Sequence, residues 1–453
     1  MLIKNMLIYS ENSPTISHVH IDEFNKWTFI NENDFEAYDD EVIDAQGHYT
    51  LMPGMLDAHI HGHGGFDFSD STVNELQIKS ICSSLGKTGL SYAMATLISL
   101  SLDELRERLK TLNNYILKQN SQPQKGLTQI VGVHLEGPFI AQECKGAHDG
   151  HVLQEKINLA CFKEIICVAP AIKEWKITLD PSLPGAIEFI NDVKKLEVDG
   201  VFVKVFLGHC NPPQHIISAA INAGAVGFTH LGNACKEGCS RKTDLSHRNE
   251  VQSHLVQWVL EHTDLDYGIE LIVDGVHLSE SFVRLIHAAA DEKIMLITDA
   301  LGPSGLKDGP FKLGSLGIRK EHNNFYLVDE NDSFILKKSS SGLEKTLAGS
   351  AASLSFCAQK YTQWIKPVLK AHSSINACLY NALIKNPRIT SLSKAAIAQL
   401  PDEQNFVVLN DHGELVLSMC QGLMVNHRTL KQDNLFLSEH VSPNESRRDA
   451  PRI

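Results

Sequence analysis

The chain has 453 residues, of which 43% are hydrophobic and 21% are charged, as in ordinary globular proteins. Its 41 basic and 54 acidic side chains give a formal net charge of −13, which argues against a nucleic-acid partner. No apolar run approaches the roughly 20 residues of a membrane helix, the apolar stretch at the N-terminus is too short for a signal peptide, and the ten cysteines are scattered. These features predict a cytoplasmic protein with no membrane partner.

The two ends of the chain both carry short strand-like segments. Residues 1–52 alternate apolar and polar side chains between breaks at Asn, Pro and Asp. Residues 386–428 contain three more such segments, with turns at 410–413 and 421–422. We therefore predict a small β-sandwich domain formed jointly by the N- and C-terminal segments. Residues 429–453 are rich in Arg, Asp, Ser, Pro and Asn and are predicted to be a disordered tail.

The central segment, residues 53–385, has a different pattern. Eight apolar runs alternate with helix-length segments as far as residue 299, the fourth run (175–179) being the least distinct. This alternation is typical of βα units with a parallel sheet, and eight strands are the number that closes a barrel. The sequence thus predicts an α/β fold, a (β/α)8 TIM-like barrel, although periodicity alone is also compatible with an open sheet.

Metal-ligand residue types stand at the ends of these runs. His59 and His61 alternate on one side of the first run, close enough to share one cation. That pair alone is a weak signal, but further candidates close other runs: Glu136, His209, His230, Asp274 with His277, and Asp299. The carboxyl ends of barrel strands meet at one mouth, and His, Asp and Glu bind divalent transition metals. The pattern predicts a metal site there, while each residue taken singly is compatible with a helix cap or a surface position.

Several motifs around these residues match one enzyme family. In chain order they are HLEGPF (134–139), KGAH (145–148), THLGNA (229–234), DGVH (274–277), TDA (298–300) and LAGS (347–350). The metal pattern resembles the amidohydrolase superfamily, and the motifs resemble its N-acetylglucosamine-6-phosphate deacetylases over about residues 50–355. The similarity is weaker in the flanking β-domain.

The resemblance implies a metal site with one catalytic acid/base. Glu136, His209 and His230 would be the main metal ligands, and His59 and His61 would hold a second metal. Some family members lack the histidine pair, so one or two divalent ions, Zn²⁺ or Fe²⁺, are expected per subunit. Asp299 would be the general acid/base, a role that its position also suggests, with a cap or a further ligand as the alternatives.

The resemblance also implies a substrate and an oligomer. The expected substrate is a small amino-sugar phosphate, and the residues implied to bind it are Ala147, His148, Asn233, Ala234, Arg241 and His277. Arg241 corresponds to a phosphate-binding arginine that in the family can reach across the interface of a homodimer, and its forked donors suit a phosphate. A solvated loop position is the alternative for Arg241.

The implied reaction is hydrolysis of the acetamide of N-acetylglucosamine 6-phosphate to glucosamine 6-phosphate and acetate, by a metal-bound hydroxide with Asp299 as general acid/base. Departures from the family pattern occur at Gly232, at Cys235 and in a long segment, 240–257, and they bear on the substrate rather than on the metal. One alternative is an amidohydrolase for another N-acyl amine or N-acetyl amino sugar. It includes the N-acyl-amino-acid and cyclic-amide hydrolases, many of which bridge two metals with a carboxylated lysine on strand four. Another is a non-catalytic barrel.

Overall fold

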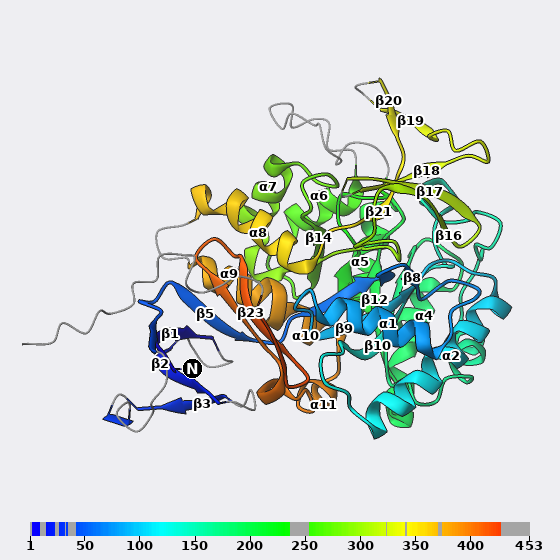
Figure 1. Cartoon of the computed structure of the whole chain (residues 1–453). Coiled ribbons are helices and arrows are strands. Elements are labelled where there is room, and N and C mark those ends of the chain that lie inside the picture. Colours follow the sequence, from blue (N-terminus) through cyan, green and yellow to red (C-terminus); the bar gives the residue numbers. More distant parts are fainter. Residues whose placement is uncertain are drawn as a thin grey trace, which may run out of the picture.

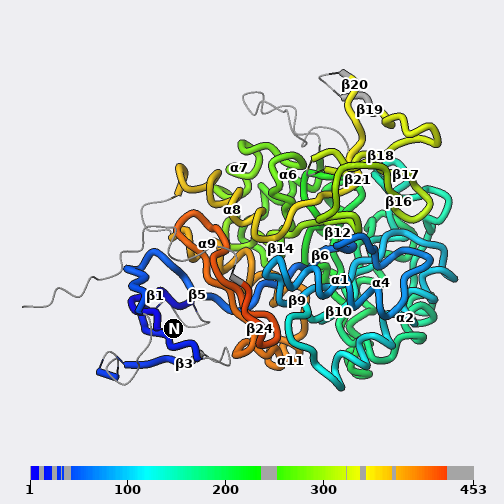
Figure 2. The backbone as a smooth tube through the Cα atoms, viewed as in Figure 1, coloured from blue at the N-terminus to red at the C-terminus, as the bar shows by residue number. Residues whose placement is uncertain are grey.

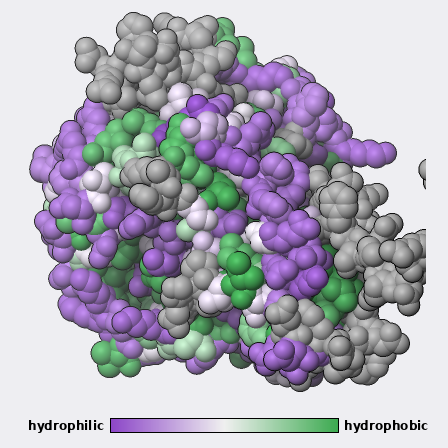
Figure 3. All heavy atoms as spheres, turned by 90° about the vertical axis from the view of Figure 1, so that its left-hand side faces the viewer, coloured by the Kyte–Doolittle hydropathy of each residue, from purple (hydrophilic) through white to green (hydrophobic). Residues whose placement is uncertain are grey.

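The computed structural model describes residues 2–9, 15–22, 27–31, 33–34, 42–235, 253–322, 324–339, 342–369 and 374–426. A central barrel carries strand-rich additions built by both ends of the chain and by residues 309–350 (Figure 1). No helix among these residues is long and apolar enough to cross a membrane. The one face drawn in Figure 3 is mostly hydrophilic among its coloured residues, with hydrophobic side chains in small separate groups.

The barrel consists of eight parallel strands in the order β15-β14-β13-β12-β11-β10-β9-β6. Their bounds are β6 (Leu56–Ile60), β9 (Tyr92–Leu97), β10 (Gln129–Glu136), β11 (Glu174–Leu179), β12 (Phe202–Leu207), β13 (Gly227–Phe228), β14 (Gly268–Ile272) and β15 (Ile294–Ile297). The ring closes where Ile60 bridges Ala300 in parallel register. The predicted barrel is thereby confirmed, including its least distinct strand, β11.

Helices follow the strands and form the outer layer. They are α1 (Glu75–Gly86), α2 (Leu102–Ser121), α3 (Leu159–Ile166), α4 (Ala186–Asp192), α5 (Gln214–Ala223), α6 (His254–Glu261), α7 (Glu280–Ala290) and α8 (Leu354–Ile365). In α2, Ser101 and Glu104 form a capping box that satisfies the first backbone N–H groups. Leu105, Leu109 and Leu112 continue from that cap at helical spacing and face the barrel as buried residues.

The terminal segments share one sheet of eight strands. From the N-terminus come β1 (Leu2–Ile8), β2 (Thr15–Ile21), β3 (Trp27–Ile30), β4 (Val42–Asp44) and β5 (Tyr49–Pro53), and from the C-terminus β22 (Phe406–Asn410), β23 (Leu415–Cys420) and β24 (Leu423–Asn426). β22 pairs antiparallel with β5, so the N-terminal and C-terminal strand segments lie side by side (Figure 2). The prediction that both termini build one β-structure is confirmed, and the predicted tail, 429–453, lies outside the described residues.

Between β15 and α8 the chain forms two smaller sheets. One contains β16 (Gly309–Leu313), β17 (Leu316–Glu321), β18 (Asn324–Val328) and β21 (Leu347–Ser350), and the other pairs β19 (Leu336–Ser339) with β20 (Gly342–Lys345). A short hairpin of β7 (Gly62–His63) and β8 (Phe66–Asp67) follows β6.

The barrel interior is apolar toward the amino ends of its strands. Its buried cluster there is Leu56, Ala58, Tyr92, Met94, Phe206, Met295 and Leu392. Leu392 follows α10 (Asn386–Ser391), and partly buried side chains of α11 (Lys394–Ile397) pack against the same cluster. The helices α9 (Ile375–Tyr380) and α10 are joined by a π-helical turn, Asn381–Lys385. This apolar floor leaves the opposite end of the barrel for polar groups.

Candidate metal centre

The predicted metal ligands meet at the carboxyl end of the barrel. His59 lies in β6 and Glu136 ends β10, while His61 is one residue beyond β6. His209, His230 and Asp299 each lie two residues beyond their strands, β12, β13 and β15. The five histidine and glutamate side chains are almost completely buried, and the Asp299 side chain is 13% exposed.

The Glu136 carboxylate is the centre of this cluster. Its Oε1 lies 3.0 Å from His209 Nε2, 2.9 Å from His230 Nε2 and 3.3 Å from His59 Nε2. The Nε2 atoms of His209 and His230 are 3.0 Å apart. Three imidazole nitrogens therefore converge on one carboxylate oxygen.

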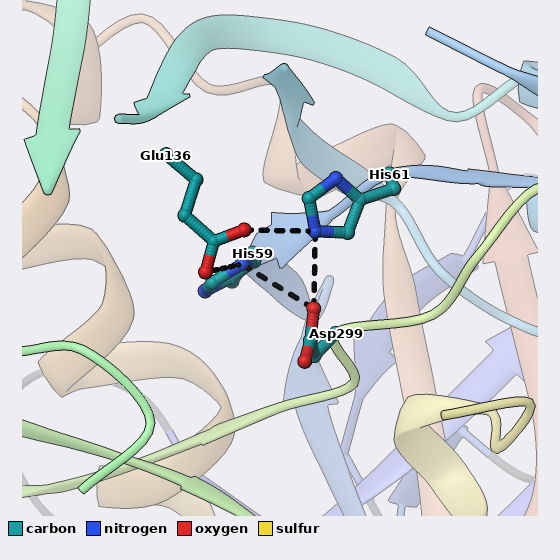
Figure 4. Close-up of side chains that lie close together, drawn as sticks. All are labelled: His59, His61, Glu136 and Asp299. Carbon is teal, nitrogen blue, oxygen red and sulfur yellow. Dashed lines mark hydrogen bonds and ion pairs between the residues drawn. The ribbon is translucent and has the colours of Figure 1, made fainter. Parts of the chain in front are cut away.

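The second oxygen of Glu136 faces a further pair of rings. Oε2 lies 3.2 Å from His61 Nε2 and 3.4 Å from His148 Nε2. Asp299 Oδ1 lies 3.0 Å from His61 Nε2 and 3.5 Å from His59 Nε2, closing a ring of four side chains (Figure 4). One ligand atom from each of these four lies within 4.8 Å of the others, and Glu136, His148 and His209 form a second such group.

The donor set fits a divalent transition metal. His59 Nε2 is fully buried and has no hydrogen-bond partner of acceptable geometry, although two carboxylate oxygens lie within 3.5 Å. A buried polar atom without a partner is unfavourable, and a bound cation held by these rings and carboxylates would satisfy it. Imidazole nitrogens with carboxylate oxygens are the ligands that zinc and ferrous iron accept.

The backbone at three strand ends is strained in the same way. His209, His230 and Asp299 have φ values of 49°, 28° and 51°, in the left-handed region that non-glycine residues rarely occupy. Such conformations cost of order 1–3 kcal/mol each and persist where surrounding contacts impose them. Here His209 Nδ1 donates to Cys144 O at 2.9 Å, and Asp299 N donates to His59 O at 2.9 Å. With these backbone conformations, the side chains of His209, His230 and Asp299 all lie in the cluster around Glu136.

Charges in the cluster oppose the effect of burial. Burial alone would raise the pKa of Glu136, but the charge on His59 and hydrogen bonds from His148, His209 and His230 hold it well below its usual value. The pKa of Asp299 is lowered for similar reasons, since burial is outweighed by the charge of His59 and the hydrogen bond from His61. Both carboxylates are therefore ionised at neutral pH.

Protons on the histidines balance those two charges before a cation binds. Burial by itself lowers the pKa of His59, but Glu136 and Asp299 outweigh it and raise that pKa to about 9. The pKa of His61 is raised well above its usual value by the same two carboxylates, also against burial. Burial dominates at His148 and lowers its pKa to about 4, so this ring is neutral.

The residues predicted to bind substrate are placed unevenly. His148 lies against the metal cluster itself, with Nε2 3.4 Å from Glu136 and Nδ1 accepting from Ser99 N at 3.1 Å. Ala147, next to it, is half-buried. Asn233 and Ala234 lie in the turn after His230, where Asn233 N and Nδ2 donate to His230 O at 2.9 and 3.3 Å.

Asp274, a candidate by its position at a strand end, makes its hydrogen bonds within its own turn. Its Oδ1 accepts from the backbone N–H groups of Val276 and His277, both at 2.8 Å, and its Oδ2 bonds His277 Nδ1 at 2.7 Å. Asp274 therefore closes its own turn and orients the His277 ring, a local bond that competes with ligation. Arg241 lies outside the described residues.

Sequence reasoning missed a polar layer just beneath the cluster. His134 bonds Thr96 Oγ1 and Thr178 Oγ1 at 3.2 and 2.8 Å, and its ring lies edge-on to His59 with centroids 4.5 Å apart. Lys176 and Glu270 lie in the same interior and are fully buried. The sequence did contain a signal for this layer, because His134, Lys176 and Glu270 each interrupt an apolar run that forms a parallel strand. Such side chains are rarely buried without a polar partner.

The parallel barrel holds a cluster of His, Glu and Asp side chains that could bind a metal at the carboxyl ends of its strands, where barrel enzymes have their active sites. The N-acetylglucosamine-6-phosphate deacetylase of Bacillus subtilis is 28% identical over 331 residues, which cover 73% of this chain and 78% of the relative. The N-acetylgalactosamine-6-phosphate deacetylase of Escherichia coli O157:H7 is 30% identical over 263 residues, 58% of this chain and 63% of the relative. No protein-family model matches the chain.

Solved structures give the same fold. The N-acetyl-D-glucosamine-6-phosphate deacetylase of Mycobacterium smegmatis, solved as a mutant in complex with N-acetyl-D-glucosamine-6-phosphate, superposes with a TM-score of 0.70 at 22% identity, covering 94% of this chain and 99% of its own. The chain is a homologue of the N-acetylglucosamine-6-phosphate deacetylases, as the sequence motifs predicted.

Proposed function

We propose that the protein removes the acetyl group of N-acetylglucosamine 6-phosphate, releasing glucosamine 6-phosphate and acetate. The observation that carries this proposal is the position of Asp299, whose Oδ1 lies 3.0 Å from His61 and 3.5 Å from His59 at the edge of the Glu136 cluster. The Bacillus relative, named for this activity, aligns with 73% of the chain.

The chain's own residues divide the work. When bound, a divalent cation supplies a Lewis acid that activates water near neutral pH and polarises a carbonyl oxygen. Asp299 is ionised and lies at the mouth of the cluster, so it takes the proton of the attacking water and passes it to the amine nitrogen as the amide C–N bond breaks. His277, fixed by Asp274 at 2.7 Å, contacts the substrate near its carbonyl or phosphate group.

The cluster offers donors for one metal or two. Glu136, His209 and His230 form one set around Glu136 Oε1. His59 and His61 form another between Glu136 and Asp299, with the carboxylate of Glu136 shared. We propose Zn²⁺ or Fe²⁺ as the ion, and elemental analysis of the purified protein gives both its identity and the number per chain.

We also propose a cytoplasmic homodimer that holds the substrate phosphate with Arg241. Among the described residues, Cys82, Cys210 and Cys357 are buried free thiols, which supports a reducing compartment. An acidic chain needs a local cationic group to bind a phosphate monoester, and the guanidinium of Arg241 supplies forked donors. Mass determination in solution, combined with Arg241→Ala kinetics, tests both statements.

A second candidate substrate is N-acetylgalactosamine 6-phosphate, the C4 epimer. It is favoured by the Escherichia coli relative, which is named for that substrate and is 30% identical over 263 residues. Both sugars present the same acetamide and phosphate, so the metal centre does not distinguish them.

The decisive experiment supplies the purified protein, with Zn²⁺ or Fe²⁺ added, with both phosphorylated sugars and with N-acetylglucosamine lacking the phosphate. Released acetate is measured for each. We expect kcat/KM to be highest for N-acetylglucosamine 6-phosphate and to fall when the phosphate is removed. Release from another amide, with none from either phosphorylated sugar, would contradict the substrate and leave the hydrolase class intact.

A further inference from the structure

A lysine–glutamate pair is enclosed in the barrel just below the metal centre. Lys176 of β11 and Glu270 of β14 are both 0% exposed, and Lys176 Nζ contacts Glu270 Oε1 directly. Lys176 Nζ also donates to Ala58 O at 3.2 Å and lies 4.4 Å from the centroid of the Phe206 ring. Enclosing two charges costs several kcal/mol per ion, and well-packed apolar side chains often serve stability as well or better. The pair therefore calls for a role besides stability.

The other oxygen of Glu270 points to that role. Oε2 lies 3.3 Å from His59 Nδ1 and accepts from His230 N at 3.4 Å. The Glu270 carboxylate thus contacts three groups: the ammonium of Lys176 below it, and the His59 ring and the His230 backbone N–H above it. His59 and His230 are both predicted metal ligands. When Nδ1 of an imidazole donates to a carboxylate, its Nε2 keeps a free lone pair for a metal.

The geometry of His59 is consistent with such control. Its Nε2 faces Glu136 Oε1 at 3.3 Å and Asp299 Oδ1 at 3.5 Å, on the opposite side of the ring from Glu270. The plane of the ring is fixed independently by His134, which meets it at 86°. Two features of the His59 ring remain to be fixed, its tautomer and the direction in which Nε2 points. Glu270 contacts Nδ1, and a hydrogen bond at that atom determines both.

We propose that the Lys176–Glu270 pair is a positioning device for the metal centre. Glu270 holds His59 with Nε2 directed at the metal position and ties the strand end at His230 to the same carboxylate, while Lys176 fixes the Glu270 carboxylate. Lys176 and Glu270 are positioning residues and touch neither metal nor substrate. This inference rests on the proposed metal centre and is independent of which sugar is hydrolysed.

The test separates positioning from stability with a double replacement. Lys176→Met combined with Glu270→Leu removes both charges and fills similar volume, and Glu270→Gln keeps an oxygen acceptor for His59. Glu174→Gln is the matched control, because Glu174 is a buried barrel carboxylate at the amino end of β11, bonded to Ser393. For each variant, thermal unfolding of the metal-free protein and the stoichiometry and affinity of Co²⁺ by absorption titration are measured.

We expect the double variant to melt close to the wild type, yet to bind at least one Co²⁺ equivalent about 10- to 100-fold more weakly, the usual effect of losing the partner of a ligating histidine. Glu270→Gln should show a smaller loss of affinity, and Glu174→Gln none. Wild-type Co²⁺ affinity in the double variant, or equal losses in Glu270→Gln and Glu174→Gln, would overturn the inference. If the double variant does not fold, the comparison of these two single variants decides. Wild-type protein that binds metal but releases no acetate contradicts the proposed function alone.

Discussion

Metal uptake should depend steeply on pH because a ligand histidine must first lose a proton. The carboxylates of Glu136 and Asp299 raise the pKa of His59 to about 9, against the effect of burial, and an imidazole binds metal only in its neutral form. Two units below such a pKa about 1% of the rings are neutral, and at the pKa about half are. Deprotonation of His59 should therefore contribute about a 50-fold rise in the affinity of its site between pH 7 and pH 9, or about 2.3 kcal/mol, and deprotonation of His61, whose pKa is also raised, adds to the pH dependence.

The assay is a competition between the protein and a chelator whose own pH dependence is known, with Co²⁺ as the probe at pH 7, 8 and 9. Calorimetry in two buffers of different ionisation enthalpy counts the protons released per metal. His59→Gln is the matched variant, since it removes the proton-binding ring and should lower the slope by one proton per metal. An affinity that is constant between pH 7 and pH 9 would refute the reasoning, as would an unchanged slope in His59→Gln.

Three further predictions concern separate parts of the molecule. Asp299→Asn should abolish acetate release while elemental analysis finds unchanged metal, because a carboxamide accepts no proton; retained turnover would remove Asp299 from its role. Asp274→Asn should raise KM more than it lowers kcat, because the His277 ring loses its charged partner at 2.7 Å, and steady-state kinetics showing the reverse would argue against substrate contact. Arg388→Met should destabilise the fold by about 2 kcal/mol, seen as a lower apparent melting temperature, because Arg388 makes two bonds of 2.7 and 2.8 Å to the partly exposed Asp402; an unchanged melting temperature would show that the pair adds nothing.

The barrel could be predicted from the sequence because its strands are apolar runs that end in polar residues. Glu136 closes β10, and His209 and His230 follow β12 and β13 at the same distance of two residues. A parallel sheet brings such ends together whatever the details of packing, so the cluster followed from the topology. The run that forms β11 is the least distinct of the eight, and it contains a lysine, Lys176. In the structure this lysine is buried and bonds Glu270.

The sequence could not show which buried polar side chains contact one another inside the barrel. Lys176 and Glu270 are 94 residues apart, and a single charge in an apolar run does not reveal which strand holds its partner. Asp274 shows a second limit, because its position at a strand end does not reveal that nearby backbone N–H groups bind its carboxylate. The resemblance assigned His148 to sugar binding, yet its Nε2 lies 3.4 Å from Glu136, a predicted metal ligand. The sequence motifs do not show that a predicted substrate residue lies in direct contact with the metal cluster.

The depth of Lys176 also bears on how a pair of metals could be bridged in this barrel. Barrels that bridge two metals with a carboxylated lysine need that lysine on strand four, which here is β11. In this chain Lys176 is level with His134, whereas Glu136 is level with Thr178, one side chain nearer the mouth on the same face of the sheet. Carboxylation would turn the Lys176 ammonium into an anion against the buried carboxylate of Glu270, which its positive charge now balances. A two-metal centre in this barrel would therefore take its bridging anion from strand three, where Glu136 has histidines facing both of its carboxylate oxygens.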